Sequence, residues 1–112
     1  MNRMLLAAFV LLIAGPAMAG DDDPPEPCFE TVGCVGDREI SAREAEKLGC
    51  DQLWTVRNGI YAGRGYCFKT ARGREAFGGY ACRYDDQSQV PLNDYERANI
   101  RLILAIEKRR GC

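Results

Sequence analysis

Residues 53–77 read LWTVRNGIYAGRGYCFKTARGREAF, and they combine a helical face, a glycine-rich stop, a cysteine and a second short helix. At about 100° per residue, one broad arc of a helix gathers the apolar side chains: Leu53, Trp54, Val56, Ile60 and Tyr61, with Thr55, Gly59 and Ala62 opposite. Asp51 stands before the helix as a candidate N-cap, and Gly63 and Gly65 follow it. The stretch therefore predicts an amphipathic helix with both ends marked.

Two polar residues interrupt the apolar arc. Arg57 lies in its middle and Asn58 at its edge. A guanidinium there either binds carboxylates and carbonyls inside the core or reaches water while its aliphatic stem stays buried. We favour an internal strut for Arg57 over a ligand contact. We expect structural roles for Trp54, Asn58 and Tyr61.

Three further helices are expected, each beginning after a capping residue: Ser41, Thr70 and Asn93. Ser41 and Asn93 are followed three residues later by a glutamate, so each pair forms a capping box. The helix after Asn93 is the longest and ends at about Arg109, before Gly111. Residues 82–90 are expected to form a loop.

The last helix is expected to bury one face, which would gather these side chains: Tyr95, Ala98, Leu102, Ile103, Ala105 and Ile106. Asn99 lies within that face, and we expect it to be structural. Ile100 and Leu104 point away from it. Residues 28–48 cover these two side chains in the interpretation we favour; in the other, they stay exposed for a partner.

The first 27 residues are expected to lie outside the folded domain. Residues 1–19 have a basic start, a short apolar run and an A-M-A end, as in a secretory signal peptide. Residues 20–27 form an acidic, proline-rich leader, and residues 28–112 form the domain. We therefore expect a periplasmic or secreted protein with no stable membrane insertion after cleavage.

All six cysteines lie in the expected mature chain, which is typical of a small exported domain held by three disulfides. If the two main helices pack antiparallel, Cys50 comes near Cys112, and Cys67 can reach Cys82. Cys28 is then left for Cys34. The predicted fold class is all-α: a small disulfide-stapled helical domain of two main antiparallel helices plus two short ones.

Enzyme chemistry finds little support in the sequence. There is no histidine for a nucleophile relay and no C-x-x-C pair, so we expect no catalytic residue, metal or cofactor. A carboxylate pair could serve a small hydrolase, but Asp85 and Asp86 are adjacent, as turn residues often are. A non-enzymatic protein is favoured.

The run RNGIYAGRGYCF, at residues 57–68, resembles the signature of the YARHG domain, a small bacterial extracytoplasmic domain. The likeness extends over about residues 50–112. The matching positions occur in the expected order: Arg57, Asn58, Ile60, Tyr61, Ala62, Gly65 and Phe68. Gly63 stands where the family has arginine, and Arg64 where it has histidine. The resemblance implies an extracytoplasmic location and a small domain rather than a particular activity.

Charge is unevenly distributed along the chain. Residues 57–83 carry six basic side chains against Glu75 alone, interleaved with aromatics, whereas residues 84–112 balance five against five. This pattern suits an envelope polymer such as peptidoglycan or an acidic glycan. Its contacts would come from a basic and aromatic set: Arg57, Arg64, Tyr66, Lys69 and Arg72. We expect an envelope polymer or envelope protein as partner and no nucleic acid; the alternative is a protein-interaction module using an apolar patch at Ile100 and Leu104.

Overall fold

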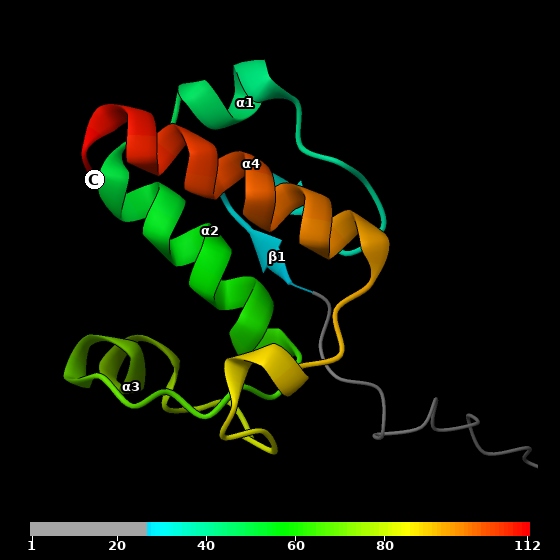
Figure 1. Ribbon diagram of the computed structural model, residues 1–112, viewed down its shortest axis with the longest axis vertical. Helices are drawn as coiled ribbons and strands as arrows, with labels where there is room; N and C mark the ends of the chain where they lie inside the picture. Colours follow the sequence, from blue (N-terminus) through cyan, green and yellow to red (C-terminus); the bar gives the residue numbers. More distant parts are fainter. Residues whose placement is uncertain (1–26) are drawn as a thin grey trace, which may run out of the picture.

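The computed structural model describes residues 27–112, which form four α-helices and a small antiparallel sheet (Figure 1). In chain order the elements are β1 (Cys28–Phe29), β2 (Gly33–Cys34), α1 (Ala42–Glu46), α2 (Cys50–Gly63), α3 (Ala71–Phe77), the 3₁₀ helix η1 (Gln87–Gln89) and α4 (Asp94–Arg110). The signal peptide expected at residues 1–19, and all but the last residue of the leader expected at 20–27, lie outside the described residues.

The all-α prediction is wrong, because β1 and β2 pair in an antiparallel hairpin. Cys28 lies opposite Cys34, and Phe29 lies opposite Gly33. The disulfide Cys28–Cys34 joins the two strands across the hairpin. Strands of two residues are too short to show the alternation by which a strand is recognised in a sequence. The turn depends instead on Gly33, whose φ of 70° favours glycine.

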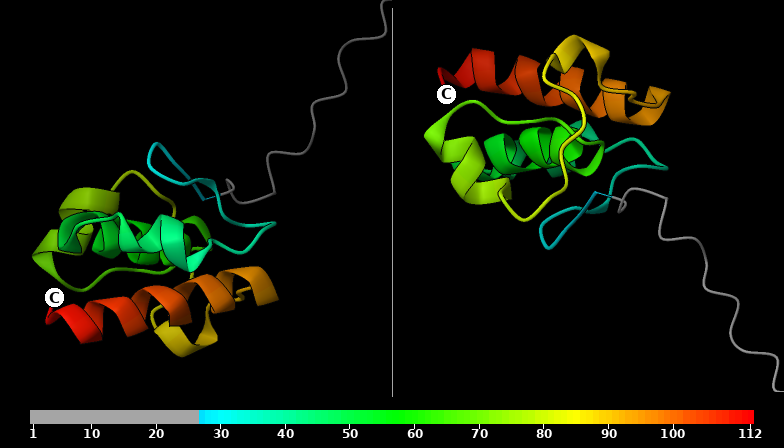
Figure 2. Two further views of the ribbon diagram at one scale, coloured as in Figure 1. Left: turned by 90° about the horizontal axis from the view of Figure 1, so that it is seen from above. Right: turned by 90° about the horizontal axis from the view of Figure 1, so that it is seen from below.

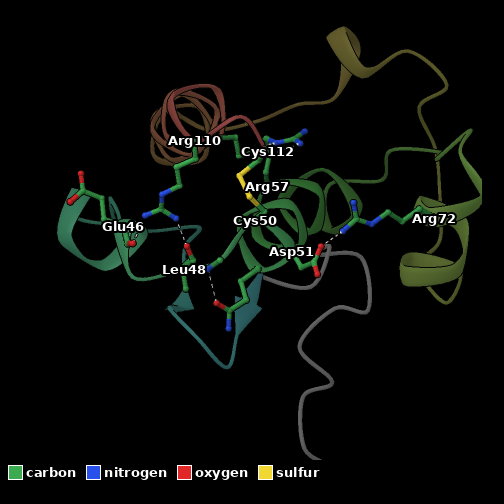
Figure 3. Close-up of a disulfide and its surroundings, with 11 residues drawn as sticks. Glu46, Leu48, Cys50, Asp51, Arg57, Arg72, Arg110 and Cys112 are labelled. Atoms are coloured by element: carbon green, nitrogen blue, oxygen red, sulfur yellow. Dashed lines mark hydrogen bonds and ion pairs between the residues drawn. A yellow bond between two sulfur atoms is a disulfide. The ribbon is translucent and has the colours of Figure 1, made fainter.

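The two long helices, α2 and α4, lie side by side and run antiparallel (Figures 1 and 2). At one end a disulfide joins Cys50, the first residue of α2, to Cys112 just beyond α4 (Figure 3). At the other end Arg64, which follows α2, pairs with Glu96 in the first turn of α4. The third disulfide joins Cys67 to Cys82. All three pairs are the predicted ones: Cys50–Cys112 and Cys67–Cys82 followed from helix direction, and Cys28–Cys34 was the pair left over.

Local capping explains where the helices begin. Ser41, Thr70 and Asn93 each accept a backbone N–H three residues on, at 3.1, 3.0 and 2.8 Å. The prediction that Asp51 caps α2 is wrong. Gly49 takes that position, and its N–H donates to the side chain of Gln52 at 3.0 Å.

The hydrophobic core lies between α2, α4 and residues 28–48. It gathers buried aliphatic side chains from all three parts: Leu53, Val56 and Ile60 from α2, Ile100, Ile103 and Ile106 from α4, and Val32, Val35, Ile40, Ala45 and Leu48 from the N-terminal part. Residues 28–48 thus cover Ile100, which is 5% exposed, while Leu104 is 46% exposed. The alternative prediction, an exposed apolar patch formed by Ile100 and Leu104, is therefore wrong.

The buried face of α2 is wider than its apolar pattern predicted, and that of α4 is shifted around the helix. In α2, Gly59 and Ala62 are buried as well as the apolar arc, because the ring of Phe29 packs directly on Gly59. In α4, Tyr95 and Ala105 are exposed. The buried stripe of α4 contains two carboxylates and an amide: Glu96, Asn99, Ile100, Ile103, Ile106 and Glu107.

Candidate functional site

Two of the arginines that we predicted to contact a ligand instead join α2 to α4. Arg57 pairs with Glu107 through two bonds, of 2.7 Å from Nε and 3.1 Å from Nη2. Arg64 Nε lies 3.0 and 2.8 Å from the two carboxylate oxygens of Glu96, whose side chain is fully buried. Both guanidiniums are thus held by internal carboxylates. Arg57 is the strut that we favoured, and Arg64 has the same role at the other end.

Arg72 is also engaged, although it lies at the surface. Its guanidinium carbon is 3.9 Å from the centroid of the Trp54 ring, close enough for a cation–π contact. Its Nη2 donates to Asp51 at 3.0 Å, which ties α3 to the first turn of α2 (Figure 3). Arg72 therefore holds α3 against α2 and has limited freedom to bind a ligand.

The aromatic residues of the same segment form a second, smaller core. Their rings contact one another in a chain with centroids 4.9 to 6.1 Å apart: Trp54, Phe77, Phe68, Tyr66 and Tyr61, with Tyr80 against Phe77. Burial raises the pKa of the Tyr61 hydroxyl. Gly73 permits the contact of α3 with Phe68, since a Cβ there would lie 2.5 Å from the ring. These aromatics hold α3 in place rather than lining a stacking site.

What remains of the predicted basic surface is small. Lys69 is exposed and Tyr66 is half-buried, beside the Cys67–Cys82 disulfide. The exposed cations nearby, Arg74 and Arg83, are followed in the chain by Glu75 and by Asp85 and Asp86. Residues 65–86, here called the α3 lobe, therefore have little excess positive charge at their surface once Arg72 has paired with Asp51.

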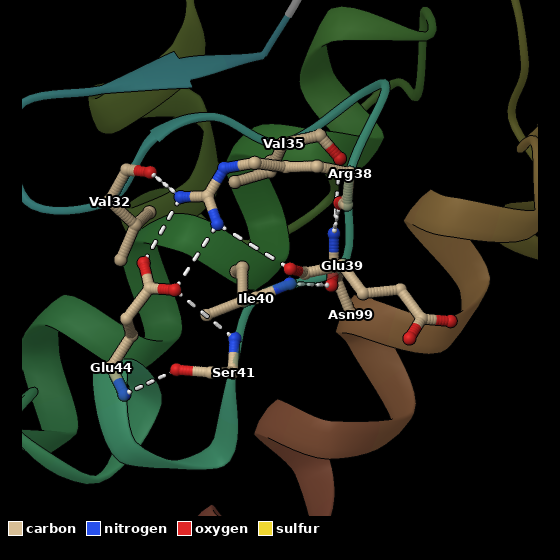
Figure 4. A network of polar contacts seen from close by, with 8 residues as sticks. All are labelled: Val32, Val35, Arg38, Glu39, Ile40, Ser41, Glu44 and Asn99. Carbon is tan, nitrogen blue, oxygen red and sulfur yellow. Dashed lines mark hydrogen bonds and ion pairs between the residues drawn. The ribbon is translucent and has the colours of Figure 1, made fainter.

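The two other polar residues that we expected to be structural make internal hydrogen bonds. Asn58 donates to the carbonyl of Trp54 within its own helix, at 2.9 Å. Asn99 accepts from Ile40 N–H at 2.7 Å and donates to the carbonyls of Val35 and Arg38 at 3.0 and 2.9 Å (Figure 4). These three bonds fasten residues 35–40 to α4.

Arg38 extends this network from residues 35–40 to α1. It donates to both carboxylate oxygens of Glu44, at 3.2 and 3.1 Å, and to the carbonyl of Val32 (Figure 4). The Arg38 hydrogen bond lowers the pKa of Glu44, and the Glu44 carboxylate raises that of Arg38. The segment that covers Ile100 is thus held by polar contacts at both ends.

The outer face of α4 is a basic surface that sequence reasoning missed. Arg97, Arg101, Leu104 and Lys108 recur at i, i+4, i+7 and i+11, so they form one exposed stripe. We call these four residues the α4 stripe. Within residues 27–112, Arg101 and Lys108 have no carboxylate within ion-pair distance, and Arg97 pairs only with Asp94 at 3.3 Å.

The α4 stripe is basic because α4 turns its two glutamates inward. Glu96 and Glu107 lie on the buried face and are paired with arginines of the α2 region. Counting charges along residues 84–112 hides this separation, since acids and bases balance there. The spacing of Glu96 and Glu107, eleven residues apart, was the signal that could have revealed it.

Asp86, one of the two adjacent acids considered for a hydrolase, does not have the properties of a general acid. Asp86 caps η1 by accepting from the Ser88 hydroxyl and N–H, at 2.7 and 3.0 Å. Those bonds lower its pKa, whereas a general acid needs a raised one. Among residues 27–112 no group of potential metal ligands gathers, and no helix there is long and apolar enough to cross a bilayer.

Comparison with known proteins identifies one family. No curated protein and no solved structure matches the chain. The family model of the YARHG domain matches residues 31–108, which include β2, the helices α1 to α3, α4 as far as Lys108 and the whole α4 stripe. The match begins well before Cys50, where the likeness in the sequence had started. Since it covers most of the chain, this protein belongs to the YARHG domain family.

Proposed function

We propose that this YARHG domain is a non-catalytic binding or accessory module that holds an anionic polymer of the bacterial envelope, such as peptidoglycan or an acidic glycan. Family membership and the three disulfides support an extracytoplasmic location, because disulfides persist in oxidising compartments. The observation that carries the proposal is the α4 stripe, which presents cations on a helix whose glutamates face inward.

The geometry of the α4 stripe favours an extended ligand over a small one. From Arg97 to Lys108 the helix rises by about 16 Å. An exposed ion pair contributes only about 0.2–1 kcal/mol, so one cation on a monomeric anion would bind weakly. A polymer with repeated negative charges engages several cations of the stripe at once, and its effective concentration raises the affinity. Leu104 adds an apolar contact at the centre of the stripe.

The α3 lobe is the competing surface, since it holds the predicted contacts Tyr66, Lys69 and Arg72. Its exposed acids offset most of its cations, and Arg72 already pairs with Asp51. On α4, by contrast, Glu96 and Glu107 are buried, so Asp94 is the one exposed acid of the helix, against Arg97, Arg101 and Lys108 of the stripe. We therefore place the polymer on α4.

Sedimentation with purified cell walls tests the proposal. Wild-type protein is expected to pellet at low salt and less at 0.15 M salt, because the screening length falls to about 8 Å there. The double variant Arg101→Glu/Lys108→Glu should stay in the supernatant. The matched control Lys69→Glu/Arg83→Glu makes the same charge change on the α3 lobe and should still pellet.

Thermal unfolding of both variants ensures that a loss of pelleting reflects the surface and not the fold. Absence of wild-type pelleting at both salt concentrations would remove the proposed ligand class. Loss of pelleting in the control alone would refute the assignment to α4 and move the site to the α3 lobe.

A further inference from the structure

A groove separates the β1–β2 hairpin from the N-terminal half of α2, on a different part of the surface from the α4 stripe. Its volume is about 230 Å³. Three residues of the hairpin form one wall and four residues of α2 form the other: Phe29, Glu30 and Thr31 face Asp51, Gln52, Thr55 and Val56. We call this the hairpin groove.

The floor of the hairpin groove is apolar and firmly positioned. Phe29 and Val56 supply it, and both pack on the hydrophobic core. The ring of Phe29 rests on Gly59, where a Cβ would approach two ring carbons to 2.5 Å. The Cys28–Cys34 disulfide holds the strand that carries Phe29. The floor of the groove is therefore positioned by the fold, and Glu30 and Thr31 of its wall lie in the turn between the two strands.

Each wall of the groove carries one carboxylate. Glu30 is exposed and has no ion-pair partner among residues 27–112. Asp51 uses Oδ1 to accept from Arg72, and its side chain is 95% exposed. No basic residue lines the groove; the other polar side chains there, Thr31, Gln52 and Thr55, are neutral. A cation is thus the charge that this groove complements.

From this arrangement we propose that the hairpin groove binds a lysine or arginine side chain of a partner protein. Such a side chain has an apolar stem and a cationic head. The stem lies on Phe29 and Val56, and the head lies between the carboxylates of Glu30 and Asp51. Arg72 already binds Oδ1 of Asp51 from α3, so Glu30 supplies the unpaired charge of the groove and Asp51 offers Oδ2, which has no hydrogen bond among residues 27–112.

Size and charge select this occupant. The groove is smaller than the roughly 300–1,000 Å³ of pockets for drug-sized ligands, so it suits one side chain. The anionic polymer proposed for the α4 stripe would be repelled by Glu30 and Asp51. The same repulsion disfavours residues 20–26 of this chain, which contain four acids and no base. This inference is therefore independent of the proposed function.

Titration monitored by backbone amide NMR tests the proposal on the intact, oxidised protein. The probe is N-acetyl-arginine methylamide, and its control is the citrulline analogue, which has a similar shape but no charge. The arginine probe should shift the amides of Glu30, Thr31, Gln52 and Thr55. The citrulline analogue should bind about tenfold more weakly, because a charged donor makes stronger hydrogen bonds to carboxylates.

Variants locate the effect. Glu30→Gln/Asp51→Asn should weaken the arginine probe about tenfold, whereas the matched change Glu75→Gln/Asp94→Asn should leave its affinity unchanged. Equal binding of both probes, equal weakening by both double variants, or shifts confined to other amides would overturn the proposal. A further outcome is a shift of the groove amides with rising protein concentration when no probe is present. That result would assign the groove to a second copy of this chain and would overturn the assignment to a different partner.

Discussion

Replacing Arg64 with methionine should cost this domain a large part of its stability, because it would leave the carboxylate of Glu96 buried without its partner. The Glu96 side chain is fully buried, and Arg64 Nε is 2.8 Å from its nearer oxygen. Removing one member of a buried pair typically costs about 3–5 kcal/mol. Arg64 itself is 22% exposed, so water screens the pair in part and we expect a loss of about 3 kcal/mol.

The reverse substitution should cost less. In Glu96→Gln the amide oxygen can still accept from Asn93 N–H, which Glu96 now binds at 3.0 Å, so the capping box survives. Arg64 can then turn its guanidinium towards solvent. We expect a loss of about 1–2 kcal/mol, and the double variant should be no less stable than Arg64→Met alone.

Urea unfolding followed by circular dichroism, under oxidising conditions, measures these differences in the free energy of unfolding. The control is Arg109→Met, which removes the ion pair between Arg109 and Glu46. The Arg109 side chain is 63% exposed and that of Glu46 is 51% exposed. That pair should contribute less than about 1 kcal/mol. Losses for Arg64→Met and Arg109→Met that agree within error would refute the reasoning, as would strict additivity in the Arg64 and Glu96 cycle.

Three further predictions concern the disulfides, a close contact and pH. The double variant Cys50→Ser/Cys112→Ser should lose about 4 kcal/mol in urea unfolding, since its disulfide spans 62 residues; an unchanged midpoint would contradict this. Gly59→Ala should lose about 1–3 kcal/mol by overpacking against Phe29, whereas a stabilised variant would show that the ring yields. Glu44→Gln should lower the melting temperature at pH 7, because the folded-state pKa of Glu44 is depressed. The difference from wild type should disappear as pH falls from about 4.3, the unfolded value, through the folded pKa; a difference that persists in acid would exclude this ion pair as its source.

Features that depend on a few neighbouring residues were predictable from the sequence. The caps at Ser41, Thr70 and Asn93 are where they were expected, and α4 ends at Gly111 with a φ of 72°. The disulfide pairs also followed, because the direction of two helices places their ends together. The hairpin did not, since its strands of two residues carry no alternation to detect.

The candidate surfaces were harder to predict, because a charged residue gives no sign of its partner. Arg57 and Arg64 are part of a basic segment in the sequence, yet each meets a glutamate at least 32 residues away. Their pairing removes two cations from the predicted binding surface. The same pairing removes two anions from the outside of α4, which leaves Arg101 and Lys108 as the exposed charge.

The sequence by itself determined the starts of α1, α3 and α4, the cysteine framework and membership of the YARHG domain family, because these rest on local hydrogen bonds, cysteine number and residue order. Only the tertiary structure decided which side chains face water. Ile100 is covered by residues 28–48, and Glu96 is buried by its pairing with Arg64. Burial and charge neutralisation require atoms from distant parts of the chain to meet, and periodicity within one helix does not record where its neighbours lie.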